Sequence, residues 1–325
     1  MEYGPALDIS STSPQKPPTV SIALLFPGQG SQIPGMLHQP PDHPAVLRTF
    51  EEVSAGLGYD VRLLDSPEAL RSTVSVQLAL LTAGVAAARA LEEEGVIPGA
   101  VAGLSVGAFA AAVHAQALTL ADCVRVVSQR AELMEKNSPD GYGLAAIIGL
   151  TEPQVVTLIQ QANTADDPVY LGNVNSPEQI VISGSSKGLE KVSIAALKAG
   201  ARKAELLNVP VLSHSPLLLP VADVLTQALQ NIQLHSPRMV YVSNVRARAL
   251  RTAAEIAWDL ANNIAHGVRW SDATTVLKEL GCNLFVEMPP GHALTNLAKQ
   301  SISQVRCIAL AETSLSYIVR QAVLV

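Results

Sequence analysis

The pentapeptide GLSVG at residues 103–107 has the composition of a turn that presents a nucleophilic serine. A short apolar strand is predicted before it, at Ala100 to Ala102, and an alanine-rich helix after it. In such a strand–turn–helix the glycines relieve a sharp bend and lift the hydroxyl of Ser105 to the edge of a sheet. The start of the helix supplies backbone N–H groups for an oxyanion. Five-residue matches also arise by chance, but the flanking elements favour an activated serine here.

An activated serine requires a general base, and the chain contains seven histidines. We interpret His114, in the helix after the turn, as a packed core histidine. Three others lie among prolines and polar residues, which indicates surface loops: His38, His43 and His235. His214 follows the segment that we predict to be inserted, and His292 occupies a loop after a strand. The order typical of α/β-hydrolases favours His292, and sequence order alone leaves both open.

Arg130 is the second residue that could take part in chemistry. In the helix predicted to run to about Lys136, it lies at the edge of the apolar stripe, whereas Arg125 points away from it. A guanidinium beside an apolar core requires a carboxylate partner. From the residues alone, a structural salt bridge within the fold is the more common outcome, by about 2:1, and a substrate carboxylate is the alternative.

Composition limits the classes of partner. The 325 residues predict about two structural units, and 48% of the residues are hydrophobic. A net charge of −6 without a basic cluster argues against nucleic acid and anionic membrane surfaces. No run approaches the roughly 20 uncharged apolar residues that a membrane helix needs. We therefore expect a small-molecule or protein partner and no membrane.

Neither a metal nor a cofactor is expected. The three cysteines form no CxxC pair, which indicates buried thiols in a reducing compartment without structural zinc: Cys123, Cys282 and Cys307. The loop GQGSQ at residues 28–32 lacks the lysine of a phosphate-binding loop, so it gives only weak support for a nucleotide. Residues 1–19 lack the basic start and apolar stretch of a signal peptide, and we expect a disordered arm on a cytoplasmic protein.

The remaining pattern predicts the elements that position these residues. A buried strand at Val20 to Phe26 precedes the loop PGQGSQ, and a long helix follows at about 68–94. Residues 141–210 have the order β-α-β-β-α-β, which is typical of a ferredoxin-like split arrangement. Helices then alternate with strands at 239–244 and 284–287, and a last helix and strand end the pattern.

We therefore predict an α/β fold. A large α/β-hydrolase-like domain with a parallel sheet would carry the serine, and a small ferredoxin-like (βαββαβ) domain would be inserted into it. The predicted division is an arm at 1–19, the large domain at 20–140 and 211–325, and the small domain at 141–210.

Five motifs occur in the order found in the malonyl-CoA:acyl carrier protein transacylases, a family that the chain resembles over nearly everything after Thr19. They are FPGQGSQ at 26–32, GLSVG, SQRAELM, NVNSPEQIVISG at 173–184 and SHSPLL. The resemblance implies that Ser105 carries the acyl group and that His214, rather than His292, is the base. It also implies that Arg130 binds the free carboxylate of a malonyl group, which reverses the preference for a structural salt bridge.

The same resemblance assigns supporting roles to backbone groups. The N–H groups of Gln29 and Val106 would form the oxyanion hole. The histidine of the family is oriented by a backbone carbonyl instead of a carboxylate, and the stretch NNIAHGVRW gives this role to Asn263, where the family often has glutamine. Leu104 and Ala108 stand where the family usually has His and Glu. These departures make GLSVGAFAAAV similar to the transacylase subunit of malonate decarboxylase.

The expected reaction is a ping-pong transfer of a malonyl group from malonyl-CoA, through an acyl-serine, to the thiol of an acyl carrier protein. We expect this role within malonate decarboxylase, whose carrier has a dephospho-CoA-derived group and whose other subunits would be further partners. A fatty-acid or polyketide transacylase, with a phosphopantetheine-type carrier, is the alternative. A serine thioesterase or hydrolase and a non-catalytic scaffold that binds CoA esters are the rivals from other classes.

Overall fold

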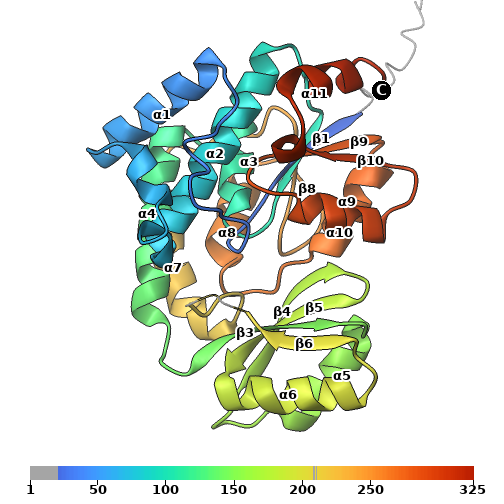
Figure 1. The fold of residues 1–325 in the computed structure, drawn as a ribbon. Coiled ribbons are helices and arrows are strands. Elements are labelled where there is room, and N and C mark those ends of the chain that lie inside the picture. The colour runs from blue at the N-terminus through green and yellow to red at the C-terminus, as the bar shows by residue number, and fades with distance from the viewer. Residues whose placement is uncertain (1–20, 208, 210) are drawn as a thin grey trace, which may run out of the picture.

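The computed structural model describes residues 21–207, 209 and 211–325, so the arm predicted at 1–19 lies outside the described residues. The chain forms a six-stranded and a four-stranded sheet, one above the other in Figure 1. The larger sheet has the order β10-β9-β1-β2-β7-β8 and is parallel except for β8, which runs antiparallel to β7. Its strands are β1 (Ile22–Phe26), β2 (Ala100–Gly103), β7 (Val240–Val242), β8 (Ala249–Leu250), β9 (Leu284–Glu287) and β10 (Arg306–Ala309).

Successive residues of β1 face opposite sides of the larger sheet. Leu24 and Phe26 belong to one apolar core, and Ala23 and Leu25 belong to a second, as the two-residue period of a strand requires. Helices cover both faces, which is why β1 is apolar throughout its length. The helices of this part of the chain are α1 (Pro44–Leu57), α2 (Thr73–Glu93), α3 (Gly107–His114), α4 (Leu120–Asn137), α7 (Leu219–Gln230), α8 (Ala253–Asn262), α9 (Trp270–Glu279), α10 (Ala293–Ser301) and α11 (Leu315–Ala322).

Several helices differ from those predicted. The helix α1 is not among the predicted elements. His43 lies at the end of the loop predicted around it and caps α1 by accepting a hydrogen bond from the N–H of Ala45 at 3.1 Å. The helix predicted from residue 68 begins only at Thr73, where the hydroxyl of Ser72 caps it. After the last predicted strand the chain adds α11, which packs against α2. By length and composition α2 could cross a membrane, but 83% of its most apolar stretch is buried inside the protein.

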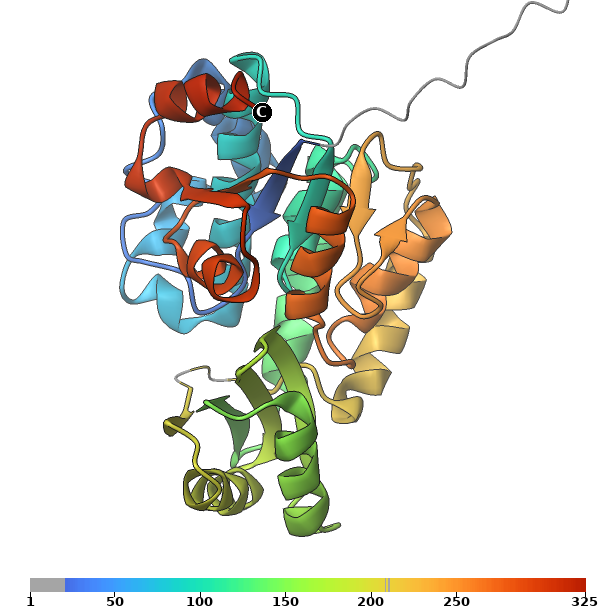
Figure 2. The same cartoon turned by 90° about the vertical axis from the view of Figure 1, so that its right-hand side faces the viewer.

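The smaller sheet confirms the predicted fold class. Its order β4-β5-β3-β6 and its antiparallel pairings are those of a ferredoxin-like split arrangement. Figures 1 and 2 both place its two helices on the side that faces away from the larger sheet. Its elements are β3 (Tyr142–Ile148), α5 (Glu152–Ala162), β4 (Val169–Ser176), β5 (Gln179–Ser185), α6 (Ser186–Lys198) and β6 (Lys203–Leu206). We propose residues 141–210 as the small domain, with 20–140 and 211–325 as the large one.

Backbone hydrogen bonds join the smaller sheet to the larger part of the chain. The N–H of Val174 donates to the carbonyl of Val268 at 2.9 Å, and the N–H of Val268 donates to Gly172 at 2.9 Å. Beside this bridge, Arg269 forms an ion pair with Glu152 at the start of α5. The two backbone hydrogen bonds therefore hold one side of β4 against the segment that leads into α9.

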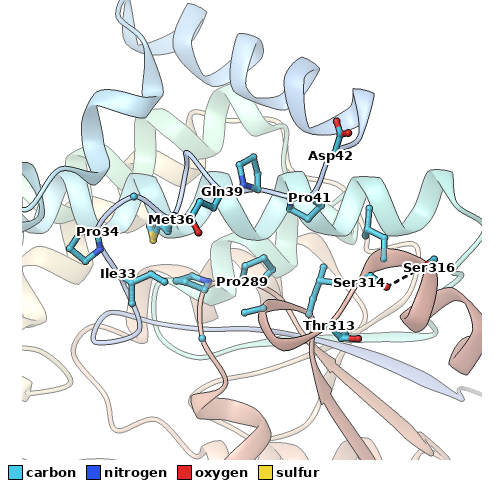
Figure 3. A pocket seen from close by; sticks show the side chains of 17 residues that line it. Ile33, Pro34, Met36, Gln39, Pro41, Asp42, Pro289, Thr313, Ser314 and Ser316 are labelled. Atoms are coloured by element: carbon cyan, nitrogen blue, oxygen red, sulfur yellow. Dashed lines mark hydrogen bonds between the residues drawn. The ribbon is translucent and has the colours of Figure 1, made fainter.

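The loops at the carboxyl ends of β1, β9 and β10 enclose a cavity of about 550 Å³ (Figure 3). Five prolines contribute to its wall, with Ile33, Met36 and Asp42 on one side and Thr313 and Ser314 on the other. Parallel strands bring their carboxyl ends to one edge of the sheet, so the turn at Ser105 ends β2 on the same edge. None of the predicted site residues lines this cavity.

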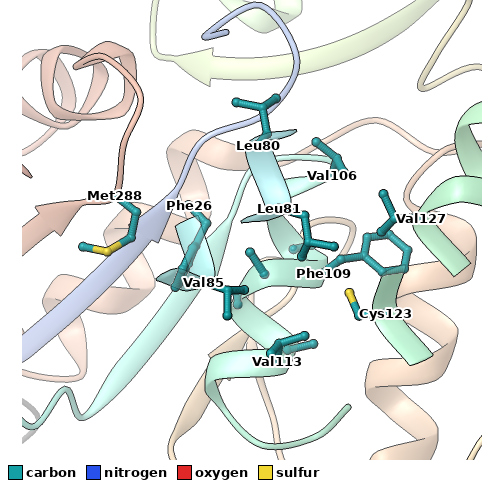
Figure 4. Close-up of a cluster of buried hydrophobic side chains, with 14 of the residues drawn as sticks. Phe26, Leu80, Leu81, Val85, Val106, Phe109, Val113, Cys123, Val127 and Met288 are labelled. Carbon is teal, nitrogen blue, oxygen red and sulfur yellow. The ribbon is translucent and has the colours of Figure 1, made fainter. Parts of the chain in front are cut away.

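The turn after β2 packs directly against β1. Figure 4 shows the apolar side chains beneath it, where Phe26 meets Val85 of α2 and Phe109 lies in α3. A Cβ added to Gly107 would lie 2.2 Å from the carbonyl oxygen of Phe26, and one added to Gly103 would lie 2.1 Å from the backbone of Gly107. Only glycine allows this approach, so both glycines of GLSVG are needed to bring the turn over β1.

The first prediction concerns this close approach. We expect Gly107→Ala to lower the free energy of unfolding by at least about 2 kcal/mol, because backbone atoms would have to move apart. Gly56→Ala is the matched control, since its added Cβ would lie 3.8 Å from a Val124 methyl group, at ordinary contact distance in a helix. The control should be neutral or gain up to about 1 kcal/mol. Urea unfolding measures both, and equal stabilities would contradict the packing described.

Candidate active site

Ser105 lies at the carboxyl end of β2, where the motif predicted it. It is 7% exposed and has a φ of 56°, in the left-handed region that residues with a side chain rarely adopt. Such a conformation costs on the order of 1–3 kcal/mol and persists only where the surroundings hold it. His214 has the same unusual φ of 56°. The predicted nucleophile and the predicted base are thus both held in strained backbone.

Arg130 of α4 is fully buried and reaches the predicted nucleophile. Its Nη2 donates to Ser105 Oγ at 3.1 Å and to Asn263 Oδ1 at 3.4 Å, while Nη1 donates to Gln77 Oε1 at 2.6 Å and contacts the sulfur of Met134. Burial lowers its pKa to about 9. No carboxylate of the described residues lies within ion-pair distance, so the structural salt bridge favoured by the residues alone does not form. The exposed Arg125, by contrast, pairs with Asp122.

His214 is buried in the segment that returns from the smaller sheet to the larger one. Its Nδ1 lies 2.6 Å from the carbonyl oxygen of Asn263, the residue that ends α8. Because a carbonyl can only accept, the proton of the neutral ring is on Nδ1, and Nε2 keeps a free lone pair. Burial, with help from the charge of Arg130, lowers the pKa of His214 to about 4. The imidazole is therefore neutral at pH 7 and has a lone pair to accept a proton.

Ser105 and His214, the predicted nucleophile and the predicted base, are not hydrogen-bonded to each other in this structure. Among the described residues, which include both Ser105 and His214, Arg130 is the one side chain that donates a hydrogen bond to Ser105 Oγ. Asn263 connects the group, since its carbonyl accepts from His214 and its Nδ2 donates to the carbonyl of Ser105 at 3.4 Å. Hydrogen bonds of catalytic groups are often long or unformed until substrate binds.

The two predicted oxyanion donors border the same turn. Across the described residues, the N–H groups of Gln29 and Val106 have no protein acceptor. A Cβ added to Gly28 would lie 2.5 Å from the carbonyl of Leu104, so the loop that carries Gln29 lies against the turn at Ser105. Free N–H groups beside a candidate nucleophile are the arrangement that an oxyanion requires.

Two residues of the site are not among those predicted from the sequence. The side chain of Asn244, just after β7, accepts from the N–H of Ser105 at 2.8 Å. Gln77 is fully buried in α2 and contacts both Arg130 and the side chain of Gln29. Each had a signal, because Asn244 is polar at the end of an apolar strand and Gln77 interrupts an apolar helix.

The other candidates lie elsewhere. The side chain of His292 is 51% exposed and pairs with Glu312, so it does not take part in the site. His114 is buried at the end of α3, and burial lowers its pKa to about 4, as expected of a packed core histidine. Within residues 21–207, 209 and 211–325, no cluster of three or more potential metal ligands occurs. The three cysteines are free and buried.

The fold and the site define an acyl transferase, and the model of the acyl transferase domain family matches residues 23–318. The malonyl CoA-acyl carrier protein transacylase of Escherichia coli K12 is 36% identical over 301 residues, which cover 90% of this chain and 96% of the relative. The chain belongs to the malonyl-CoA–acyl carrier protein transacylase family.

Solved structures of the family have the same fold. The transacylase of Coxiella burnetii is 35% identical, with a TM-score of 0.87 over 93% of this chain and 96% of that one. A malonyl-transacylase solved in complex with a type II polyketide acyl-carrier protein is 34% identical. Its TM-score is also 0.87, over 93% of this chain and 99% of that one.

The low pKa of His214 predicts an unusual pH profile for Ser105. A base must be neutral to act, so an ordinary histidine would leave roughly one tenth of the pH 7.5 rate at pH 5.5. With a pKa of about 4, we expect more than roughly nine tenths of the rate to remain. The measurement is the labelling rate of Ser105 by a fluorophosphonate, which does not itself titrate in this range. A midpoint near 6.5 would refute the buried, neutral base, and Ser105→Ala gives the unlabelled control.

Proposed function

We propose that the protein transfers a malonyl group from malonyl-CoA, through an ester on Ser105, to the thiol of an acyl carrier protein. The observation that carries this proposal is the buried guanidinium of Arg130, which lacks a carboxylate among the described residues and lies 3.1 Å from Ser105 Oγ. A malonyl thioester has a carboxylate close to its reacting carbonyl, so one substrate would pair with Arg130 and reach Ser105. The names of the relatives, and the solved complex of one of them with an acyl-carrier protein, support this substrate and this partner.

In the first half-reaction, His214 Nε2 would take the proton of Ser105 as Oγ attacks the thioester carbonyl. The C–S bond then breaks, and coenzyme A leaves as the thiol with the proton from His214. In the second half-reaction the carrier thiol gives its proton to His214 while its sulfur attacks the serine ester. The C–O bond breaks and the proton returns to Ser105. The N–H groups of Gln29 and Val106 would hold the oxyanion in both steps.

The proposal for the carrier rests on two residues in and directly after the turn. Leu104 and Ala108, in place of the usual His and Glu, support a role as the transacylase subunit of malonate decarboxylase, in the cytoplasm. Ala108 is fully buried, and Leu104 is partly buried, packing against the second core and lying close to Gly28 in the loop that carries Gln29. We propose that they bear on the choice of carrier rather than on the chemistry.

Intact mass after brief mixing with malonyl-CoA tests the proposed reaction. We expect a malonyl-sized adduct on the wild type and none on Ser105→Ala. A thiol should discharge the adduct faster than water, and two carriers are compared, one with phosphopantetheine and one with a dephospho-CoA-derived group. Equally fast discharge by water would instead indicate a hydrolase, and the absence of an adduct would indicate a scaffold. Faster discharge by the second carrier would support malonate decarboxylase.

Arg130→Ala tests how the carboxylate is recognised. Losing a buried charge-assisted pair should slow acylation by malonyl-CoA by at least about 100-fold, while acylation by acetyl-CoA should rise because the carboxylate site is gone. Arg125→Ala is the matched control, since it removes the same charge from an exposed position of α4. Single-turnover acylation measures all three proteins. An unchanged preference for malonyl-CoA in Arg130→Ala would overturn the assignment.

A further inference from the structure

The side chain of Asn244 bridges the turn that carries the predicted nucleophile. Its Oδ1 accepts from the N–H of Ser105 at 2.8 Å, and its Nδ2 donates to the carbonyl of Gly103 at 2.7 Å. An amide can satisfy both groups at once, because it carries an acceptor and donors on one planar group. Asn244 is 3% exposed, so water does not replace either bond. One buried side chain thus ties the first residue of GLSVG to the third.

This bridge matters because the backbone of Ser105 is strained and needs contacts that hold it. A residue with a side chain stays at a φ of 56° only when its surroundings hold it there. The position of Ser105 Oγ follows from that backbone angle, and it is what brings the hydroxyl within 3.1 Å of Arg130. If the N–H of Ser105 lost its acceptor, the turn could relax and move Oγ away from Arg130.

A buried carboxylate holds Asn244 in turn. Asp259 of α8 accepts from the N–H of Asn244 at 3.1 Å, from the N–H of Val245 at 3.2 Å and from the hydroxyls of Tyr241 and Ser243. Asp259 is fully buried, and no cation of the described residues lies within ion-pair distance of it. Burial raises its pKa, while these hydrogen bonds act in the opposite direction. Its side-chain hydrogen bonds therefore all go to β7 and the loop after it, which presents Asn244.

The same helix also holds the base. Asp259 and Asn263 are four residues apart, one turn of α8 and its C-cap, and so lie on one face. Asn263 receives the hydrogen bond from Nδ1 of His214 through its carbonyl. One helical turn therefore contacts the nucleophile through Asn244 and the base directly.

We propose that Asn244 is a positioning residue of this site, that Asp259 holds it, and that the end of α8 thereby fixes the nucleophile and the base relative to each other. The proposal rests on Ser105 being the nucleophile of the proposed function. In this proposal neither Asn244 nor Asp259 contacts the substrate. Both residues act by fixing the position of Ser105.

The test measures the reaction of Ser105 with two reagents. A fluorophosphonate phosphonylates Oγ: a P–O bond forms, the P–F bond breaks and the hydroxyl proton passes to His214, and the reagent has no carboxylate to pair with Arg130. Malonyl-CoA acylates the same serine in a single turnover. We expect Asn244→Ala to slow both about 100-fold, the effect of a displacement of about 1 Å. Affinity for malonyl-CoA, compared between Ser105→Ala and the double variant Ser105→Ala with Asn244→Ala, should change by less than about threefold. Thr49→Ala, which removes another buried hydrogen bond in α1, is the stability control.

Two further variants separate positioning from loss of folding. Asn244→Asp keeps the acceptor, and protonation of the introduced carboxyl restores a donor toward Gly103. Its labelling rate relative to wild type should therefore rise as the pH falls through the range in which this carboxyl titrates. Asp259→Asn should slow labelling, and adding it to Asn244→Ala should slow labelling no further, because both act on one path.

The outcomes distinguish this inference from the proposed function. If malonyl-CoA fails to acylate the wild type, the proposed function fails, yet the fluorophosphonate still reports on Asn244. Labelling of Asn244→Ala within about threefold of wild type would overturn the positioning role. Rates that multiply in the double variant would overturn the link through Asp259. A labelling rate of Asn244→Asp equal to that of wild type at a pH where the introduced carboxyl is ionised would show that the bond to Gly103 does not matter.

Discussion

The buried charge of Arg130 is the constraint on which the site depends. A guanidinium inside a protein is costly unless it is paired, and here the described residues offer it only neutral acceptors, from Gln77, Asn263 and Ser105. An internal carboxylate would satisfy the charge and leave nothing for a substrate to pair with. The same charge adds to burial in lowering the pKa of His214, so it helps keep the predicted base neutral. One cation without an internal partner thus leaves a site for a substrate carboxylate and favours the neutral imidazole.

The parallel sheet explains how residues so far apart in the chain meet. Gln29, Ser105 and Asn244 follow β1, β2 and β7, which are neighbours in the sheet and end at the same edge. The helix layer supplies the rest, with Arg130 from α4 and Asn263 from the end of α8. His214 arrives with the chain returning from the smaller sheet, so the two sheets are jointly needed to complete the site.

The sequence predicts those features of the fold and the site that depend on residues close together in the chain. The glycines of GLSVG and the strand pattern of the smaller sheet are local signals, and they lead to the correct turn and fold class. The helix position of Arg130 predicts a guanidinium beside the core, but from the residues alone it favours a salt bridge that does not form among the described residues. The helix α1 is missed because its cap is a histidine in a proline-rich stretch, which resembles a loop. Asn244 bonds Ser105 across 139 positions of the chain, and no local pattern reveals such a partner.

The pairing of β1 with β9 has a consequence for how the protein is made. Ile22 pairs with Leu284, so one edge of the first strand remains open until nearly the whole chain exists. Contacts of such high sequence separation slow folding, and an unpaired apolar strand in the growing chain is prone to pair wrongly. The sheet edge that carries the site is therefore completed late, after synthesis has passed the insertion and reached the C-terminal strands. A nascent chain released before β9 would have its predicted nucleophile but an open sheet beside it.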